Sequence, residues 1–393
     1  MLNTNFAPWP AYTNEEAEAV TAVLLSNKVN YWTGKECRHF EQEFADWCGT
    51  KYAVAVANGT VAIDLALKAL NVGIGAEVIV TSRTFIASVS CIVTAGAKPI
   101  FVDVDINTQN MAPHAIAAAI SPKTRAIICV HLAGYPCAMD DIMQIANKHG
   151  LYVIEDCAQA HGARYKGSSV GSIGHIGAWS FCQDKIMTTG GEGGMVTTNN
   201  SALWSKIWSY KDHGKSWEAV YAREHAPGFR WLHEHFGTNW RMTEMQAAIG
   251  RIQLRRMPLW HQQRLTNAKT IWEQAKLIPG LRVPELGPDV EHAAYKCYVF
   301  VMPEYLKSNW NRERIIQEIN ALGVPCYSGS CSEVYLEQAF DNTSYRPIER
   351  LKNAKELGET SLMFLVHPNI SASDITRTCD VLSMVMQQAI LGI

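Results

Sequence analysis

Short runs of apolar and β-branched residues alternate with longer stretches of helical periodicity through the first 200 residues. This alternation is typical of βαβ units, whose parallel strands form one sheet and whose helices cover its faces. Seven segments fit strands, namely residues 53–57, 76–82, 99–105, 125–132, 151–157, 177–181 and 193–198. Helices fit residues 61–70, 85–96 and 139–150, and glycines end the last two as C-caps do. We therefore predict an α/β chain built on a large, mostly parallel seven-stranded sheet.

The pattern changes at about Met242. Residues 243–278 predict a long amphipathic helix, which we expect Pro258 to kink or split. Beyond it, strand-like and helical segments follow at residues 296–303, 312–323 and 324–330, with a final helix from Ser373. These segments predict a smaller α+β unit. We expect two domains, a large one over residues 1–254 and a small C-terminal one over residues 255–393.

Composition excludes several classes of protein. The chain has 393 residues, of which 48% are hydrophobic and 18% charged, with a formal net charge of −2. Neither disorder nor nucleic-acid binding is expected from these values. Eleven cysteines lie scattered without zinc-like spacing, so we expect no metal site and free thiols in the cytoplasm. We also expect no signal peptide and no membrane span, because no apolar run approaches the length of a spanning helix.

A single lysine stands between a predicted strand and a glycine-rich run. Lys185 follows the strand at residues 177–181, and glycines occupy positions 190, 191, 193 and 194. Glycines let the backbone turn tightly and approach a ligand closely. The alternative is a solvated lysine before a turn, which is common.

Two further segments point to a ligand. Asp156 ends a predicted strand at the edge where open α/β sheets bind ligands, although Asp also favours helix N-caps. Gly59 and Thr60 lie where a strand passes into a helix, and a helix start attracts anions such as phosphate. A plain turn capped by Thr60 would use the same residues. Together, a lysine, a strand-end acid and a phosphate cradle match what pyridoxal 5'-phosphate requires.

Five motifs strengthen this interpretation: TGKECRHFEQEFADWCGTKYAVAV, NGTVAIDLAL, EDCAQAHGA, WSFCQDKIMTTGGEGG and NWRMTEMQAAIGRIQL. They resemble the DegT/StrS family of sugar aminotransferases, which belongs to the fold-type I class of pyridoxal phosphate enzymes. The resemblance covers about residues 13–254, with weaker agreement near residues 296–303 and 367–371. It implies the aspartate aminotransferase-like fold, with a large sheet domain and a smaller C-terminal domain.

The resemblance also implies roles for individual residues. Lys185 would form the Schiff base and shuttle the proton, and Asp156 would pair with the pyridine nitrogen. The other cofactor-binding residues implied are Thr60, Val61 and Ser180 at the phosphate, beside Gly59, with Gln159 near the ring, Phe85 stacked on it and Asn239 reaching the phosphate of a neighbouring subunit. A homodimer with shared active sites follows from the last of these. Phe85 has a plain alternative as a core residue, and His367 and Cys326 are expected to be structural.

Relatives that dehydrate sugars carry histidine at the lysine position, so Lys185 favours transamination. We expect L-glutamate as the amino acid donor, a keto sugar as the acceptor and ping-pong kinetics. The sequence further resembles the branch that makes 8-amino-3,8-dideoxy-manno-octulosonate for lipopolysaccharide, at residues 82–90, 131–141, 180–194 and 208–216. That acidic acceptor would suit Arg83, Arg230 and Arg241, because arginine binds carboxylates bidentately. The alternatives are a nucleotide-linked keto-hexose acceptor and, in a different class, a regulatory protein that binds the cofactor without turnover.

Overall fold

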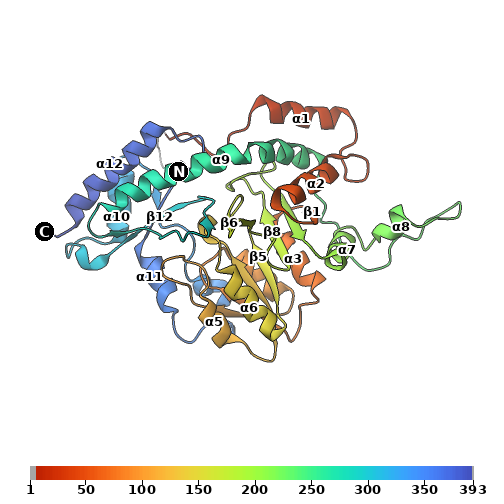
Figure 1. The fold of residues 1–393 in the computed structure, drawn as a ribbon, viewed down its shortest axis with the longest axis horizontal. Coiled ribbons are helices and arrows are strands. Elements are labelled where there is room, and N and C mark those ends of the chain that lie inside the picture. Colours follow the sequence, from red (N-terminus) through yellow and green to blue (C-terminus); the bar gives the residue numbers. More distant parts are fainter. Residues whose placement is uncertain (1–5, 392–393) are drawn as a thin grey trace.

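The computed structural model describes residues 6–391, and its centre is a seven-stranded sheet in the order β1-β9-β8-β5-β4-β2-β3 (Figure 1). The strands are β1 (Tyr52–Val56), β2 (Glu77–Thr81), β3 (Lys98–Val102), β4 (Thr124–Val130), β5 (Tyr152–Asp156), β8 (Ile176–Ser180) and β9 (Gly194–Thr198). Only β9 runs against its neighbours, β1 and β8. The predicted seven-stranded, mostly parallel sheet is therefore confirmed.

Both faces of this sheet are buried, which explains why its strands read as continuous apolar runs. Along β2, Val78 and Val80 face a cluster that includes Phe40 and Phe44, whereas Ile79 faces the opposite cluster with Met139. The covering helices are α2 (Glu36–Cys48), α3 (Gly59–Ala69), α4 (Ala87–Thr94), α5 (Pro113–Ala119), α6 (Met139–His149) and α7 (Ser201–Tyr210). The three helices predicted in this half are all present. Strands β2, β3, β4, β5 and β8 run parallel, so their carboxyl ends lie at one edge of the sheet.

A long helix, α9 (Glu244–Lys276), joins the two halves of the chain. Thr243 and Gln246 form a capping box at its start, and α1 (Asn14–Leu25) packs beside it through ion pairs such as Arg256–Glu16. The helix runs unbroken through Pro258, so the expected split does not occur. Its first half packs in the core of the large sheet and its second half in the C-terminal core. The division expected at residue 254 would cut this helix, and it stays a prediction.

The C-terminal part contains a four-stranded antiparallel sheet in the order β10-β12-β14-β13. Its strands are β10 (Leu281–Arg282), β12 (Cys297–Val301), β13 (Cys326–Tyr327) and β14 (Ser361–Phe364), and its helices are α10 (Arg312–Ala321), α11 (Lys352–Thr360) and α12 (Ala372–Ala389). The strand expected over residues 324–330 is shorter, and Gly329 turns the chain with a φ of 87°. The smaller α+β unit is otherwise as predicted.

Short elements complete the described chain. Strands β6 (Arg164–Tyr165), β7 (Ser168–Ser169) and β11 (Val290–Glu291) form a third sheet, and the 3-10 helices are η1 (Leu132–Gly134), η2 (Pro303–Tyr305), η3 (Val334–Leu336) and η4 (Gln338–Phe340). Among the described residues, no helix is long and apolar enough to cross a membrane.

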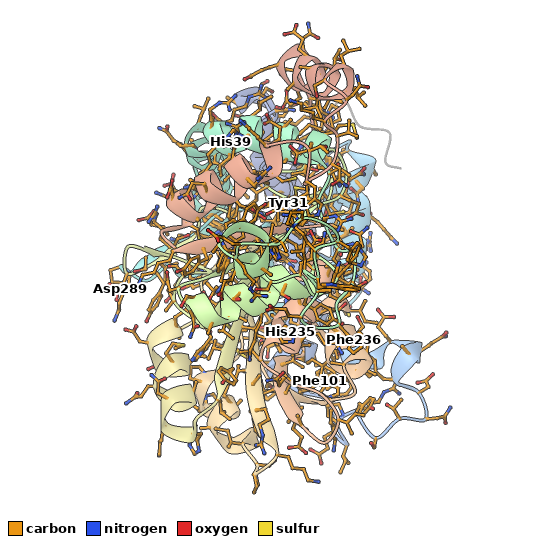
Figure 2. All side chains as sticks on the ribbon, turned by 90° about the vertical axis from the view of Figure 1, so that its right-hand side faces the viewer. Tyr31, His39, Phe101, His235, Phe236 and Asp289 are labelled. Atoms are coloured by element: carbon orange, nitrogen blue, oxygen red, sulfur yellow. The ribbon has the colours of Figure 1, made fainter. Side chains whose placement is uncertain are left out.

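Residues 213–240, which include α8 (Trp217–Tyr221), project from the body and are called the arm below (Figure 1). A bridge between Asp212 and Asn239 closes the base of the arm. Three aromatic side chains of the arm are open to solvent, with Phe236 fully exposed, Trp231 81% exposed and Phe229 77% exposed, whereas Trp217 and Trp240 pack against the core. Figure 2 faces the side from which the arm projects and labels Phe236 on it. Such exposed aromatic surface is unusual on a protein that acts alone.

Candidate active site

A cavity of about 750 Å³ lies where strands β5 and β8 end and helix α3 begins. This is the edge at which open α/β sheets bind ligands. Residues from four other segments complete its wall, including the loop after β8 and the stretch before β12. The predicted site residues that line it are Gly59, Thr60, Val61, Phe85, Asp156, Gln159, Ser180 and Lys185. Most of the predicted cofactor site is therefore brought together within one chain.

The start of helix α3 has the form of a phosphate cradle. Asn58 caps it, and its side-chain oxygen accepts the Val61 N–H at 2.9 Å, so Asn58 rather than Thr60 is the N-cap. The first-turn N–H groups of a helix lack acceptors in the helix and carry the positive end of its dipole. A Cβ on Gly59 would lie 2.5 Å from Cβ of Ser180, so glycine alone lets the helix start come this close to the end of β8. The Ser180 hydroxyl thereby joins the same cradle.

Asp156 ends β5 and is buried, with 5% of its surface exposed. One carboxylate oxygen accepts the Ser88 hydroxyl at 2.7 Å, and the other accepts the Ala158 N–H at 3.1 Å. Burial raises the pKa of Asp156, and the Ser88 and Ala158 hydrogen bonds act against that rise. A buried carboxylate held in this way suits a cationic partner such as a protonated ring nitrogen.

Two other predicted residues shape the cavity. Phe85 is 68% exposed while lining it, so the alternative of a core phenylalanine does not apply. The side-chain oxygen of Gln159 accepts the Ala133 N–H at 2.8 Å, which fixes the Gln159 amide at the cavity wall. An exposed aromatic face beside a buried acid fits a planar, charged ring.

The loop after β8 holds Lys185 at several points. Its N–H donates to the Cys182 carbonyl at 3.0 Å, and its own carbonyl accepts the indole N–H of Trp9 at 2.8 Å. The Lys185 amine lies 3.3 Å from both carboxylate oxygens of Asp184 and 5.4 Å from the centre of the Tyr295 ring. The glycines that follow allow close packing. A Cβ on Gly194 would lie only 2.4 Å from the Asn58 carbonyl oxygen.

Sequence reasoning missed several residues of this cavity. Asp184, Tyr295 and Lys296 line it, as do Ser330 and Cys331. Asp184 adjoins Lys185 in the sequence and could have been noticed there. The others come from segments more than one hundred residues away, and no motif marks them.

Four predicted residues lie outside the cavity of a single chain. Arg83 is fully buried, donates to the Ser361 hydroxyl at 2.9 Å and lies over the Tyr298 ring at 5.2 Å. Arg241 pairs with buried Asp212 at 2.7 Å. The remaining two, Arg230 and Asn239, are exposed on the arm. Arg83 and Arg241 therefore do not line the cavity, although Nε and Nη1 of Arg83 have no hydrogen-bond partner among the described residues.

The large sheet, the strand-end acid and the lysine beside a phosphate cradle define the fold-type I class of pyridoxal phosphate enzymes. Comparison with known proteins makes this more specific. Residues 10–383 match the sequence profile of the DegT/DnrJ/EryC1/StrS aminotransferase family. The chain belongs to the DegT/DnrJ/EryC1/StrS aminotransferase family, and it is a pyridoxal phosphate-dependent sugar transaminase.

Three relatives illustrate the similarity. The solved structure of an aminotransferase from Psychrobacter cryohalolentis is 63% identical, with a TM-score of 0.95 over 98% of this chain and 99% of that chain. GDP-perosamine synthase from Caulobacter vibrioides is 36% identical over 90% of this chain and 91% of its own. A dTDP-3-amino-3,4,6-trideoxy-alpha-D-glucose transaminase from Streptomyces venezuelae is 32% identical over 94% of this chain and 92% of its own.

Proposed function

We propose that this enzyme transfers an amino group from L-glutamate to a nucleotide-linked keto sugar. The observation that carries the proposal is the set of cations at the cavity. Lys296 lines it, whereas Arg83 and Arg241, predicted to bind a sugar carboxylate, are held elsewhere. Relatives named for GDP-linked and dTDP-linked sugars support the same acceptor class. The alternative acceptor is a keto-octulosonate.

The chain's own residues take these roles in the proposal. Lys185 would hold the cofactor through its amine, and the same amine, when not bonded to the cofactor, would carry the proton removed from the donor's α-carbon. Asp156 would keep the ring nitrogen protonated, and the start of α3 with Ser180 would hold the phosphate. When bound, pyridoxal phosphate supplies an electron sink for the carbon that loses its proton. Lys296 faces the acceptor and attracts its diphosphate.

A test loads the enzyme with an amino group from glutamate and removes excess donor. The loaded enzyme is then mixed with a nucleotide-linked keto sugar or with a keto-octulosonate, while the visible absorbance of the bound cofactor is followed. Recovery with the nucleotide sugar alone is the expected result. Recovery with the octulosonate alone would overturn the acceptor assignment. Lys296→Ala should raise KM for the acceptor and leave KM for glutamate unchanged.

We also propose a homodimer in which the arm of one copy reaches the active site of the other. Asn239 lies on the exposed arm and not at the cavity of its own chain. The exposed Phe229, Trp231 and Phe236 side chains provide apolar surface for such a contact.

Complementation tests the shared site. Lys185→Ala and Asn239→Ala are each expected to be nearly inactive. If subunits exchange at random, an equal mixture should regain about a quarter of wild-type activity, because half of the dimers are hybrids with one intact site. A mixture that stays inactive after proven subunit exchange would contradict the proposal.

A further inference from the structure

The amine of Lys185 rests against a hydrogen-bonded pair that the roles described above leave unused. Asp184 lies within 3.3 Å of the amine, and the Tyr295 hydroxyl donates to Asp184 at 2.5 Å. The ring of Tyr295 also faces the amine at 5.4 Å. Asp184 is about half exposed, whereas Tyr295 is buried and Lys185 is 18% exposed. One carboxylate therefore contacts both the reactive amine and a buried hydroxyl.

Tyr295 is anchored from the cofactor side of the site. Its backbone N–H donates to the Ala133 carbonyl at 3.0 Å, and the Ala133 N–H donates to the Gln159 side chain at 2.8 Å. Ala133 takes the left-handed conformation, with a φ of 57°. A non-glycine residue keeps this conformation only where the surrounding structure imposes it, so the backbone that anchors Tyr295 is held in a defined geometry. A continuous set of hydrogen bonds thus runs from Gln159 through Tyr295 to Asp184.

We propose that Asp184 and Tyr295 hold the Lys185 amine whenever it is not bonded to the cofactor, and set the pH at which that amine can accept a proton. The proposal rests on the role of Lys185 described under the proposed function, but not on the identity of the acceptor. Asp184 contacts the reacting atom and is in this sense catalytic. Tyr295 acts through Asp184 and is a positioning residue.

The two groups act in opposite directions. A carboxylate beside the amine favours its charged ammonium form and so opposes its use as a base. The Tyr295 hydroxyl donates a hydrogen bond to the Asp184 carboxylate, and this bond weakens the interaction between the carboxylate and the Lys185 ammonium. Burial tends to raise the pKa of Asp184, but the Lys185 charge and the Tyr295 hydroxyl lower it below its usual value. The amine nitrogen therefore carries the proton taken from the donor, and the proton does not pass to Asp184.

Other titratable or charged groups also face this part of the site from neighbouring elements. They are Asp156 at the end of β5, His161 in the turn after it, Cys182 and Glu192 in the lysine loop, Lys296 before β12 and Arg264 on α9. None of these changes in the variants below. A difference between variants therefore reports on Asp184 and Tyr295.

The test uses Asp184→Asn and Tyr295→Phe, which preserve shape. For Asp184→Asn, the acid limb of the first half-reaction with saturating glutamate should move down by about 0.5 to 1 pH unit, because the ammonium loses its partner. For Tyr295→Phe, the acid limb should move to higher pH, because the Asp184 carboxylate no longer accepts the tyrosine hydroxyl and interacts more strongly with the Lys185 ammonium. The double variant should behave as Asp184→Asn alone, since Tyr295 acts through the carboxylate. Asp140→Asn, in an exposed pair with Lys166, is the matched control and should move nothing.

A second readout needs no turnover. In the cofactor-free protein, limiting acetic anhydride labels neutral amines, and mass spectrometry measures the labelling of Lys185. Asp184→Asn should label about three- to tenfold faster at a fixed pH, and Tyr295→Phe more slowly. Shifts of the same sign in both variants, or no shift in either, would overturn the proposal. Borohydride reduction followed by peptide mapping tests separately whether Lys185 binds the cofactor. Cofactor found on another lysine would refute the role of Lys185 in the proposed function, rather than the role of Asp184 and Tyr295.

Discussion

Replacing Trp9 by phenylalanine should loosen the active-site lysine without removing the aromatic packing around it. The indole N–H of Trp9 donates to the Lys185 carbonyl across 176 positions of sequence. The ring packs edge-on against Trp260 at 5.1 Å and stacks on His367 at 5.7 Å, with the Arg264 guanidinium 4.8 Å from its centre. Phenylalanine keeps an aromatic ring for these contacts, but it loses the N–H donor and some packing volume, which the Trp204→Phe control below matches.

The size of the effect follows from these contacts. Losing one hydrogen bond and leaving the Lys185 carbonyl without its partner costs about 1–2 kcal/mol of the free energy of unfolding. Trp9→Ala also loses the contacts to three neighbouring side chains, which brings the total to about 3–5 kcal/mol. The phenylalanine variant should therefore fold, with a lower urea midpoint, and turn over more slowly because the lysine backbone is less restrained.

Urea unfolding of the cofactor-free protein measures the stability, and a single-turnover reaction with glutamate measures the rate. Trp204→Phe is the control, because that ring stacks on Tyr52 at 5.0 Å and away from the lysine loop. If Trp9→Phe matched the wild type in both measurements while Trp9→Ala was strongly destabilised, Trp9 would be a packing residue only. That result would refute the argument that its N–H restrains Lys185.

Three further predictions address the cofactor site. Lys185→Ala should lose turnover and the covalent attachment of cofactor that borohydride reduction makes permanent, while its circular dichroism spectrum stays native; attachment that persists would place the anchor elsewhere. Gly59→Ala, whose Cβ would press on Ser180, should cost about 1–3 kcal/mol and weaken cofactor binding in a titration. Because burial raises the pKa of Asp156, the cofactor-free fold should lose stability as the pH rises through that value. Asp156→Asn should remove this loss in urea melts at pH 5 and pH 8, yet bind cofactor less tightly; an unchanged pH dependence would contradict the assignment.

The sequence was most informative where a local residue pattern determines both the secondary structure and the position of a functional side chain. Strands buried on both faces carry continuous apolar runs, so all seven could be placed, and Asp156 could be assigned to a strand end. Glycine at position 59 and the lysine beside the glycine-rich loop marked two more walls of the cavity. These features depend on local patterns that a single segment contains.

Contacts between distant segments could not be predicted. Tyr295 reaches Asp184 because its backbone bonds to Ala133, and neither residue belongs to a recognisable motif. The three arginines were predicted from their ability to bind a carboxylate and from their places near expected substrate loops. Charge type does not reveal that Arg83 would be buried over Tyr298 or that Arg241 would find Asp212.

Helix α9 has a mechanical consequence. At 1.5 Å per residue, its 33 residues span about 50 Å, and one half is embedded in each core. Residues from both parts of the chain line the cavity, since Lys185 belongs to the large-sheet part and Ser330 to the C-terminal part. If the cavity opens by rotation of the C-terminal part relative to the large-sheet part, helix α9 must therefore bend or move with one of them. Pro258 lies near the end of the part embedded in the large-sheet core, between Met257 and Trp260, and it lacks a backbone N–H, so elastic bending should concentrate there.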